Sequence, residues 1–351
     1  MPAFANLPLR PTIPPMEAKS VEALPEGEGW HHEPKWDGFR VLVFRDGDDI
    51  ELQSKAEKPL GRYFPELVEA VRAIPRERFV VDGEMVIPVN GELSFDALQM
   101  RLHPAETRIR KLARDTPARI ILFDCLALDE RSLVGEPLAA RREALESFHE
   151  AAGGDLMLSP YTRDRAVAEG WLAGSGVALD GVIAKRADAP YSPGERAMLK
   201  VKRLRSADCV VGGFRYAAKV NGGGKREVGS LLLGLYDDQG KLNHVGFTSA
   251  IPAAERPALT KRLEALVEAP GFTGSAPGGP SRWSTERSTE WQPLRPELVV
   301  EVRFDHAGAN RFRHGTGFLR WRPDKAPRQC RMEQLYSPTP LAAIGDLGGG
   351  A

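Results

Sequence analysis

Short apolar runs separated by turn residues dominate the first two hundred positions and predict a sheet-rich domain. Such runs mark strands at 41–44, 50–54, 79–87, 118–128 and 179–185. Apolar residues at helical spacing mark helices at 67–74, 137–152 and 164–173. Strands that follow one another through turns, with helices interspersed, are typical of an α+β domain with antiparallel sheets and flanking helices.

The pattern changes at about residue 206, where shorter strands follow one another. They are expected at 209–214, 230–236, 241–248, 298–304 and 317–321, with one helix at 253–269. Five short strands with a single helix favour a small OB-fold β-barrel. We therefore expect one domain over 1–204, a barrel over 205–336 and a flexible tail over 337–351.

Composition describes a water-soluble protein. The 351 residues are 42% hydrophobic and 27% charged, and they contain only three cysteines without paired spacing. No apolar run approaches the roughly 20 residues that span a bilayer. The N-terminus lacks a long apolar segment and predicts an extended arm rather than a signal peptide. A cytoplasmic location is the resulting expectation.

The charge is balanced overall but locally uneven. Lysine and arginine number 48, as do aspartate and glutamate, so the whole chain is not basic. Residues 196–205 nevertheless carry several basic side chains and no acid, and residues 311–328 carry six against a single Asp324. Two basic stripes on a neutral body suit contact with a phosphate backbone, although solvated faces would show the same pattern.

The segment W-H-H-E-P-K-W-D-G-F-R at 30–40 contains a candidate nucleophile, Lys35. Pro34 disfavours a helix and Gly38 permits a turn, so we expect the lysine in a loop at the end of a strand. An ordinary lysine pKa of about 10.4 leaves roughly one amine in a thousand neutral at pH 7, so a nucleophilic lysine needs burial or cationic neighbours.

Carboxylates beside glycines recur in the predicted strands. Asp82 and Glu84 flank a glycine, and Asp124 lies in a near-continuous apolar run, where it requires a partner. The adjacent residues His31 and His32 could suggest a metal site. Neighbouring residues on a strand point to opposite faces, which argues against a shared ion.

A second carboxylate–glycine strand carries Asp180, and a third strand follows at 198–202 with strict alternation. Alternation places Lys200 and Lys202 on one face of that strand. Two ammonium groups on one face repel each other, so we expect an anion between them.

Seven short motifs occur in a fixed order along the chain. They are K-W-D-G-F-R (35–40), S-K-x6-R-Y-F-P-E-L (54–67), V-D-G-E (81–84), L-F-D (122–124), D-G-V-I-A-K (180–185), L-K-V-K (199–202) and R-W-R-P-D-K (320–325). In this order and rough spacing the chain resembles the ATP-dependent DNA ligases, and especially the bacterial ligase C group related to the ligase domain of ligase D. The resemblance implies an adenylation (nucleotidyltransferase) domain followed by an OB-fold domain.

This resemblance implies the covalent chemistry. Lys35 would attack the α-phosphate of ATP, form lysyl-AMP and release pyrophosphate. Lys200 and Lys202 would hold the α-phosphate and stabilise the charge that develops there. Asp324 and Lys325 of the OB-fold domain would orient the pyrophosphate. AMP would then pass to the 5′-phosphate of a DNA nick, and the 3′-hydroxyl would displace it.

The nucleoside contacts also follow from the resemblance. Arg40 and Glu84 would hold the ribose, Glu33 the adenine edge, and Phe123 and Ile183 the two faces of the base. The other nucleotide-binding positions it implies are Pro34, Lys55 and Arg196.

The resemblance further implies metal and DNA contacts. Asp37 and Asp180 would bind Mg²⁺ or Mn²⁺. The implied DNA contacts are Arg62, Lys185, Arg203, Arg320 and Arg322. Two positions depart from the family: Asp180 replaces a glutamate, and Lys55 replaces an arginine, which removes a bidentate phosphate contact. These departures put the strength of metal and 5′-phosphate binding in doubt.

The expected function is sealing of nicks in duplex DNA by a monomer, in repair and recombination, with repair polymerases or end-binding proteins as candidate partners and no membrane association. Two alternatives remain at this point. One is an RNA or mixed-strand ligase, and the other is a non-catalytic module that binds nicks or ends.

Overall fold

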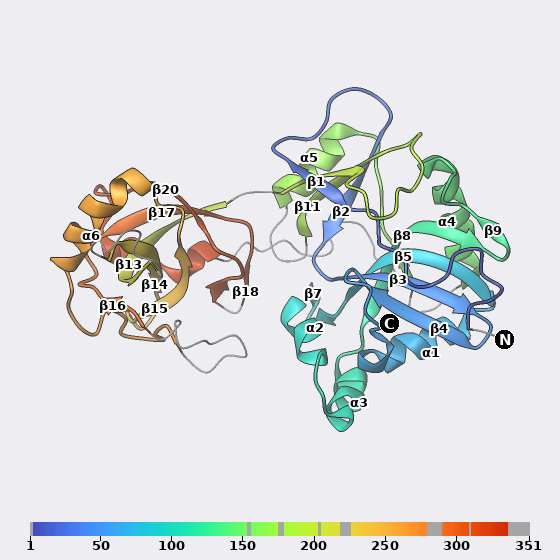
Figure 1. The fold of residues 1–351 in the computed structure, drawn as a ribbon, viewed down its shortest axis with the longest axis horizontal. Helices are drawn as coiled ribbons and strands as arrows, with labels where there is room; N and C mark the ends of the chain where they lie inside the picture. Colours follow the sequence, from blue (N-terminus) through green and yellow to red (C-terminus); the bar gives the residue numbers. More distant parts are fainter. Residues whose placement is uncertain are drawn as a thin grey trace. The chain divides into compact units, whose positions relative to one another are not determined.

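The computed structural model describes residues 3–152, 156–174, 179–202, 205–217, 226–278, 290–308 and 310–335. The chain divides into two compact units that part between residues 203 and 204 (Figure 1). Each unit has its own sheets and its own buried core. The expected tail at 337–351 lies outside the described residues.

The larger sheet of the first unit has the strand order β10-β8-β5-β3-β4. Its strands are β3 (Phe39–Asp46), β4 (Asp49–Ser54), β5 (Arg78–Val86), β8 (Arg119–Leu128) and β10 (Leu156–Leu158), with β9 (Arg131–Ser132) paired to β8. All pairs are antiparallel except β10 with β8. The near-continuous apolar sequences of β3, β5 and β8 fit strands that are buried on both faces.

A smaller sheet in the same unit has the order β1-β12-β11-β2. Its strands are β1 (Ala18–Val21), β2 (Trp30–Trp36), β11 (Leu179–Arg186) and β12 (Met198–Val201). The prediction that Lys35 lies in a loop is therefore wrong, because β2 continues through Lys35 and pairs it with Gly181 of β11. Pro34 is tolerated within this strand opposite Val182, and the turn comes after Trp36.

Helices surround these sheets. They are α1 (Pro65–Ala73), α2 (Phe95–Arg101), α3 (Glu106–Asp115), α4 (Leu138–Ala152) and α5 (Arg165–Gly174), and a small hairpin joins β6 (Pro88–Val89) to β7 (Glu92–Leu93). Three of the helices fall where the apolar spacing predicts them. The sequence analysis did not identify α2 and α3, although Ser94 caps α2 through a hydrogen bond from the Ala97 amide.

Asp124 has the partner that its apolar surroundings require. Arg141 of α4 donates to both carboxylate oxygens, at 2.7 and 3.0 Å, and each side chain is only 1% exposed. The same guanidinium donates to the carbonyls of Glu136 and Ala189. This satisfied pair attaches α4 to β8.

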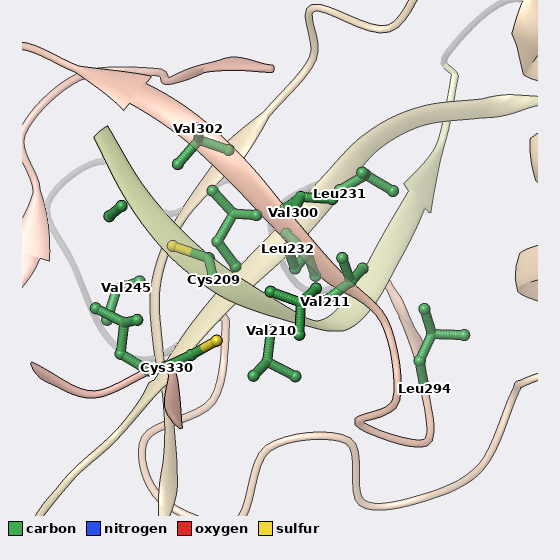
Figure 2. Packing of buried hydrophobic residues seen from close by; sticks show 14 of the residues in the cluster. Cys209, Val210, Val211, Leu231, Leu232, Val245, Leu294, Val300, Val302 and Cys330 are labelled. Carbon is green, nitrogen blue, oxygen red and sulfur yellow. The ribbon is translucent and has the colours of Figure 1, made fainter. Parts of the chain in front are cut away.

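The second unit contains a sheet of order β15-β14-β13-β17-β20. Its strands are β13 (Arg205–Tyr216), β14 (Val228–Tyr236), β15 (Leu242–Thr248), β17 (Val299–Phe304) and β20 (Gly317–Trp321), with β16 (Gln292–Pro293) on β13 and a separate pair of β18 (Ala307–Gly308) and β19 (Arg311–Phe312). A bridge from Thr248 to Thr316 links the last residue of β15, at one edge of the sheet, to the residue before β20, at the other edge. Figure 2 shows Cys209 and Cys330 among the aliphatic side chains of its core; all three cysteines are free and buried.

The helix of this unit is shorter than predicted. It spans α6 (Arg256–Glu264) rather than 253–269. Beyond it, the backbone from Leu266 to Glu268 bonds to residues 293–295, and this pairing replaces further helical hydrogen bonds. None of the described helices is both long enough and apolar enough to cross a membrane.

Candidate active site

A pocket with a cavity volume of about 210 Å³ lies in the first unit, lined by residues of both sheets. Nine of the predicted catalytic and nucleotide-binding residues line it: Glu33, Pro34, Lys35, Arg40, Lys55, Glu84, Phe123, Ile183 and Lys200. These side chains come from positions far apart in the sequence. The fold therefore gathers the predicted nucleotide-binding positions around one cavity.

Strand register explains how the small sheet builds its wall of the pocket. Ile183 of β11 pairs with Glu33 on one side and with Lys200 of β12 on the other. Residues in register point to the same face of a sheet. Glu33, Ile183 and Lys200 thus form a row across three strands, with Lys35 two residues further along β2 on the same face.

Asp180 joins Lys35 to Lys202. The Lys35 Nζ donates to Asp180 Oδ2 at 2.5 Å, and the Lys202 Nζ lies 2.9 Å from the same oxygen. The carboxylate of Asp180 therefore lies between Lys35 and Lys202, and the anion expected between Lys200 and Lys202 stays a prediction. The candidate nucleophile consequently lies close to a second cation, as its chemistry requires.

Gly181 makes this arrangement possible. Its φ is +138°, and a Cβ atom there would lie 2.0 Å from the Val201 carbonyl oxygen. Only glycine permits that close approach of β11 to β12. The neighbouring Asp180 is thereby held beside the end of β12.

Opposing influences set the pKa values of this cluster. Burial disfavours the charged form of Asp180, but the charges and hydrogen bonds of Lys35 and Lys202 outweigh it and bring the pKa of Asp180 below its usual value. Burial lowers the pKa of Lys200, and the charges of Lys35, Lys202 and Lys55 lower it further. Cationic repulsion is therefore concentrated at this end of the pocket.

Arg40 is fixed by a buried carboxylate. Its Nε and Nη2 atoms donate to the two oxygens of Asp82, each at 2.6 Å, and the Tyr191 hydroxyl donates to Asp82 at 2.7 Å. The guanidinium carbon lies 4.6 Å from the centre of the Phe123 ring. Asp82 outweighs the effect of burial and keeps the pKa of Arg40 above its ordinary value.

The carboxyl group of Glu84 titrates well above the usual range of a glutamate. Burial raises its pKa to about 7, while the charges of Lys35 and Arg40 act in the opposite direction. Near neutral pH this carboxyl group is divided between its two forms. It can therefore donate as well as accept a hydrogen bond.

Lys185 does not lie where the sequence analysis expected. Its Nζ is 2.8 Å from Glu33 Oε2 and 4.8 Å from the Phe123 ring centre, and it is 4% exposed. Lys185 also lines the pocket. The prediction that it contacts DNA is wrong, because strand alternation turns it to the same buried face as Ile183. Burial raises the pKa of Glu33, and the charge of Lys185 opposes this.

Lys55 is an exposed member of the pocket lining, and three other predicted residues do not line the pocket. Lys55 pairs with Glu17 at 3.2 Å, Arg62 is exposed and stacks on Tyr63, and Arg196 is exposed. Asp37 occupies the turn after β2 and raises the pKa of Glu84 through its charge. Arg203 lies outside the described residues.

The second unit holds the remaining predicted residues in an ion-pair network. Arg322 donates to Asp208 and Asp324, both at 2.8 Å, and Lys325 lies 3.2 Å from Asp208. Arg320 pairs with Glu301 at 2.7 Å and stays 63% exposed. The hydrogen bond from Arg322 is the largest cause that lowers the pKa of Asp324, to about 2.

Sequence reasoning missed one wall of the pocket. Residues 15–18 line it, and Met16 is 4% exposed. The alternation of apolar Leu7, Leu9 and Ile13 before Met16 hinted at a packed arm, but no charged motif marked it. Within the described residues, no group of three or more His, Cys, Asp or Glu side chains is arranged to hold a metal ion.

Comparison with known proteins gives a consistent family. Residues 15–202 match the family described as ATP dependent DNA ligase domain, and residues 224–325 match the ATP dependent DNA ligase C terminal region. The chain is 46% identical to DNA ligase C2 of Mycolicibacterium smegmatis, over 97% of this chain and 98% of that protein. It is also 46% identical to DNA ligase C of Mycobacterium tuberculosis, over 95% and 96% of the two chains.

Fold similarity extends to more distant proteins. A solved structure from a structure-function study of Lig E DNA ligases matches with a TM-score of 0.52 at 16% identity, over 88% of this chain and 99% of that one. At this identity the likeness concerns the fold.

Proposed function

Because the chain belongs to the ATP-dependent DNA ligases, we propose that Lys35 captures AMP from ATP and that the protein passes it to the 5′-phosphate of a nick in duplex DNA. One observation carries this proposal: Lys35 lines the same pocket as Arg40, Glu84, Phe123 and Lys200, and its amine contacts Asp180. One pocket thus contains a nucleophile, polar side chains that can bind the ribose hydroxyls, an aromatic ring that can stack on the base, and a cation that can bind phosphate.

In the first step, the Lys35 amine forms a bond to the α-phosphorus of ATP, the bond to the bridging oxygen breaks, and pyrophosphate leaves. Lys200 neutralises charge on the α-phosphate, and Lys202 holds Asp180 and thereby Lys35. Because the pKa of Asp180 is lowered, its carboxylate is a weak base. Asp180 therefore orients the Lys35 amine rather than accepting a proton from it.

Base and ribose contacts follow from the walls of the pocket. Glu33, held by Lys185, faces the base edge, while Phe123 and Ile183 offer apolar surfaces to its faces. Arg40 and Glu84 hold the ribose hydroxyls, and Pro34, Lys55 and Arg196 complete the nucleotide contacts. Burial in this pocket makes the polar contacts selective, because an unmatched base would leave Glu33 or Lys185 without a partner.

A divalent cation, Mg²⁺ or Mn²⁺, suits the carboxylates at this end of the pocket. Asp180 is ionised and lies beside Lys35, and Asp37 lies two residues after Lys35, in the turn that follows β2. Such an ion prefers one or two carboxylates together with phosphate oxygens and water, and it supplies neutralisation of phosphate charge. Asp37 and Asp180 are the residues that would hold it.

The later steps involve DNA. AMP passes from Lys35 to the 5′-phosphate, and the 3′-hydroxyl then displaces AMP and closes the strand. Arg62 on the first unit and Arg320 and Arg322 on the second are the proposed phosphate contacts, with Arg203 as a further candidate. Asp324 and Lys325 orient pyrophosphate in the first step. We assign the protein to DNA repair as a cytoplasmic monomer, with repair polymerases or end-binding proteins as partners.

Transfer of label from α-labelled ATP to the protein tests the proposal. Wild type should gain one label per chain that survives denaturation in SDS, and Lys35→Ala should gain none, because the proposed nucleophile is removed. The matched control is Lys58→Ala, an exposed lysine outside the pocket. Equal labelling of wild type and Lys35→Ala, or none in wild type, would contradict the mechanism and favour a non-catalytic nick-binding module.

A further inference from the structure

The N-terminal arm, residues 3–17, is fastened along the larger sheet of the first unit. The Asn6 amide and side chain donate to Asp46 of β3 at 2.9 and 3.1 Å. Further along, Gln53 of β4 exchanges two hydrogen bonds with the Ile13 backbone, at 3.1 and 2.6 Å. Leu7 and Met16 are buried in one cluster with residues of β3, β5 and β8. The arm is therefore an integral part of the folded unit.

Four residues form a closed ring of hydrogen bonds where the arm reaches the pocket. The Met16 amide donates to the Tyr191 hydroxyl at 3.0 Å, and that hydroxyl donates to Asp82 at 2.7 Å. Asp82 accepts two bonds from Arg40, and Arg40 Nη2 donates to the Met16 carbonyl at 3.4 Å. Tyr191 and Asp82 are buried, so the ring is shielded from water.

From this ring we infer that Met16 and Tyr191 are positioning residues for ATP, acting through Arg40. Asp82 holds the Arg40 guanidinium from one side only. The Met16 carbonyl restricts Arg40 from a second side, and the Tyr191 hydroxyl fixes the carboxylate of Asp82. Arg40 in turn lies over the Phe123 ring, the proposed base platform. The N-terminal arm thereby becomes a wall of the nucleotide site that helps to set affinity for the ribose.

The inference rests on the proposed nucleotide pocket but not on covalent chemistry. Binding can therefore be measured in the Lys35→Ala protein, which cannot form lysyl-AMP. In that background, Tyr191→Phe removes the hydroxyl that links Met16 to Asp82 but keeps the buried aromatic side chain. Leu7→Ala is the matched control, because Leu7 packs in the same cluster but does not line the pocket.

Calorimetric titration with ATP and with 2′-deoxy-ATP, together with the Tm of each protein, provides the test. We expect Tyr191→Phe to weaken ATP binding about tenfold and to reduce the preference for ATP over 2′-deoxy-ATP, because Arg40 is less well fixed at the ribose. Leu7→Ala should lower the Tm but keep both affinities within about twofold.

Three outcomes would overturn the inference. One is unchanged binding in Tyr191→Phe, and another is an equal loss in Leu7→Ala, which would indicate general destabilisation. The third is failure of the Lys35→Ala parent to bind ATP, which would also overturn the proposed pocket. If that parent binds ATP but wild type gains no label, only the proposed covalent function fails.

Discussion

The two units use charged residues in different ways. In the pocket of the first unit, the ion pairs of Lys35 and Arg40 join distant segments and are largely buried: Lys35 and Asp180 are 145 positions apart, and Arg40 and Asp82 are 42 apart. In the second, Asp324 is bonded by Arg322 two residues away and is 61% exposed. Buried pairs are held by the fold, whereas exposed neighbours can exchange partners at little cost.

This difference suits the two tasks we propose. A pocket that orients one small nucleotide benefits from side chains fixed before the ligand arrives. A surface that meets a phosphate backbone benefits from cations that can leave one carboxylate for another anion. The following predictions test whether the contrast holds.

The largest expected effect is on stability. Arg141→Met leaves the carboxylate of Asp124 buried without its partner, which should cost about 3–5 kcal/mol in the unfolding of the first unit. Arg320→Met removes an exposed pair in the second unit and should cost less than about 1 kcal/mol. Urea unfolding, with the transition of each unit followed separately, measures both. Comparable losses would remove the distinction between the units.

An intermediate effect is expected from the protonation of Glu84. Its folded pKa of about 7 exceeds the ordinary value of 4.5, so the folded protein retains a proton that the unfolded chain releases. The contribution of this proton to the free energy of unfolding is complete below pH 4.5, falls as the pH rises from 4.5 through 7, and does not change further above that range. Relative to wild type, the Glu84→Gln protein should therefore gain about 3 kcal/mol in the free energy of unfolding between pH 4.5 and pH 8.

Denaturant unfolding across this range checks the sign as well as the size. Glu143→Gln, at an exposed position of α4, is the matched control and should follow wild type at every pH. A Glu84→Gln difference that is constant with pH would mean that the carboxyl group does not titrate in this window.

The smallest expected effect concerns the salt dependence of DNA binding. Affinity for a nicked duplex should fall steeply with salt, and Arg320→Ala should reduce the slope of log K against log salt by about 0.9, the share of one phosphate contact. Arg331→Ala is the control, because Arg331 of the same unit is also exposed and paired. A shallow wild-type slope, or equal changes in both variants, would count against Arg320 as a DNA contact.

Much of the architecture was predictable from local patterns. Period-two and continuous apolar runs located most strands of both units, and the order of short motifs identified the ATP-dependent DNA ligase family, which the comparisons confirm. The expected adenylation domain with a following OB fold is likewise confirmed. Local patterns failed for α2, which is only seven residues long, and for α3, whose own sequence is strongly charged. They also failed for the end of α6, where pairing with residues 293–295 overrides helical spacing.

The sequence by itself determined which residue types were available: a lysine before Asp-Gly, carboxylates beside glycines, and alternating lysines. Only the tertiary structure decided how they pair. Strand register placed Asp180 between Lys35 and Lys202 and turned Lys185 into the pocket, and the packing of the N-terminal arm brought Met16 to Arg40. The physical reason is that period and composition fix the face of a strand on which a side chain lies, whereas its partner can come from a chain segment 145 residues away, as for Lys35 and Asp180.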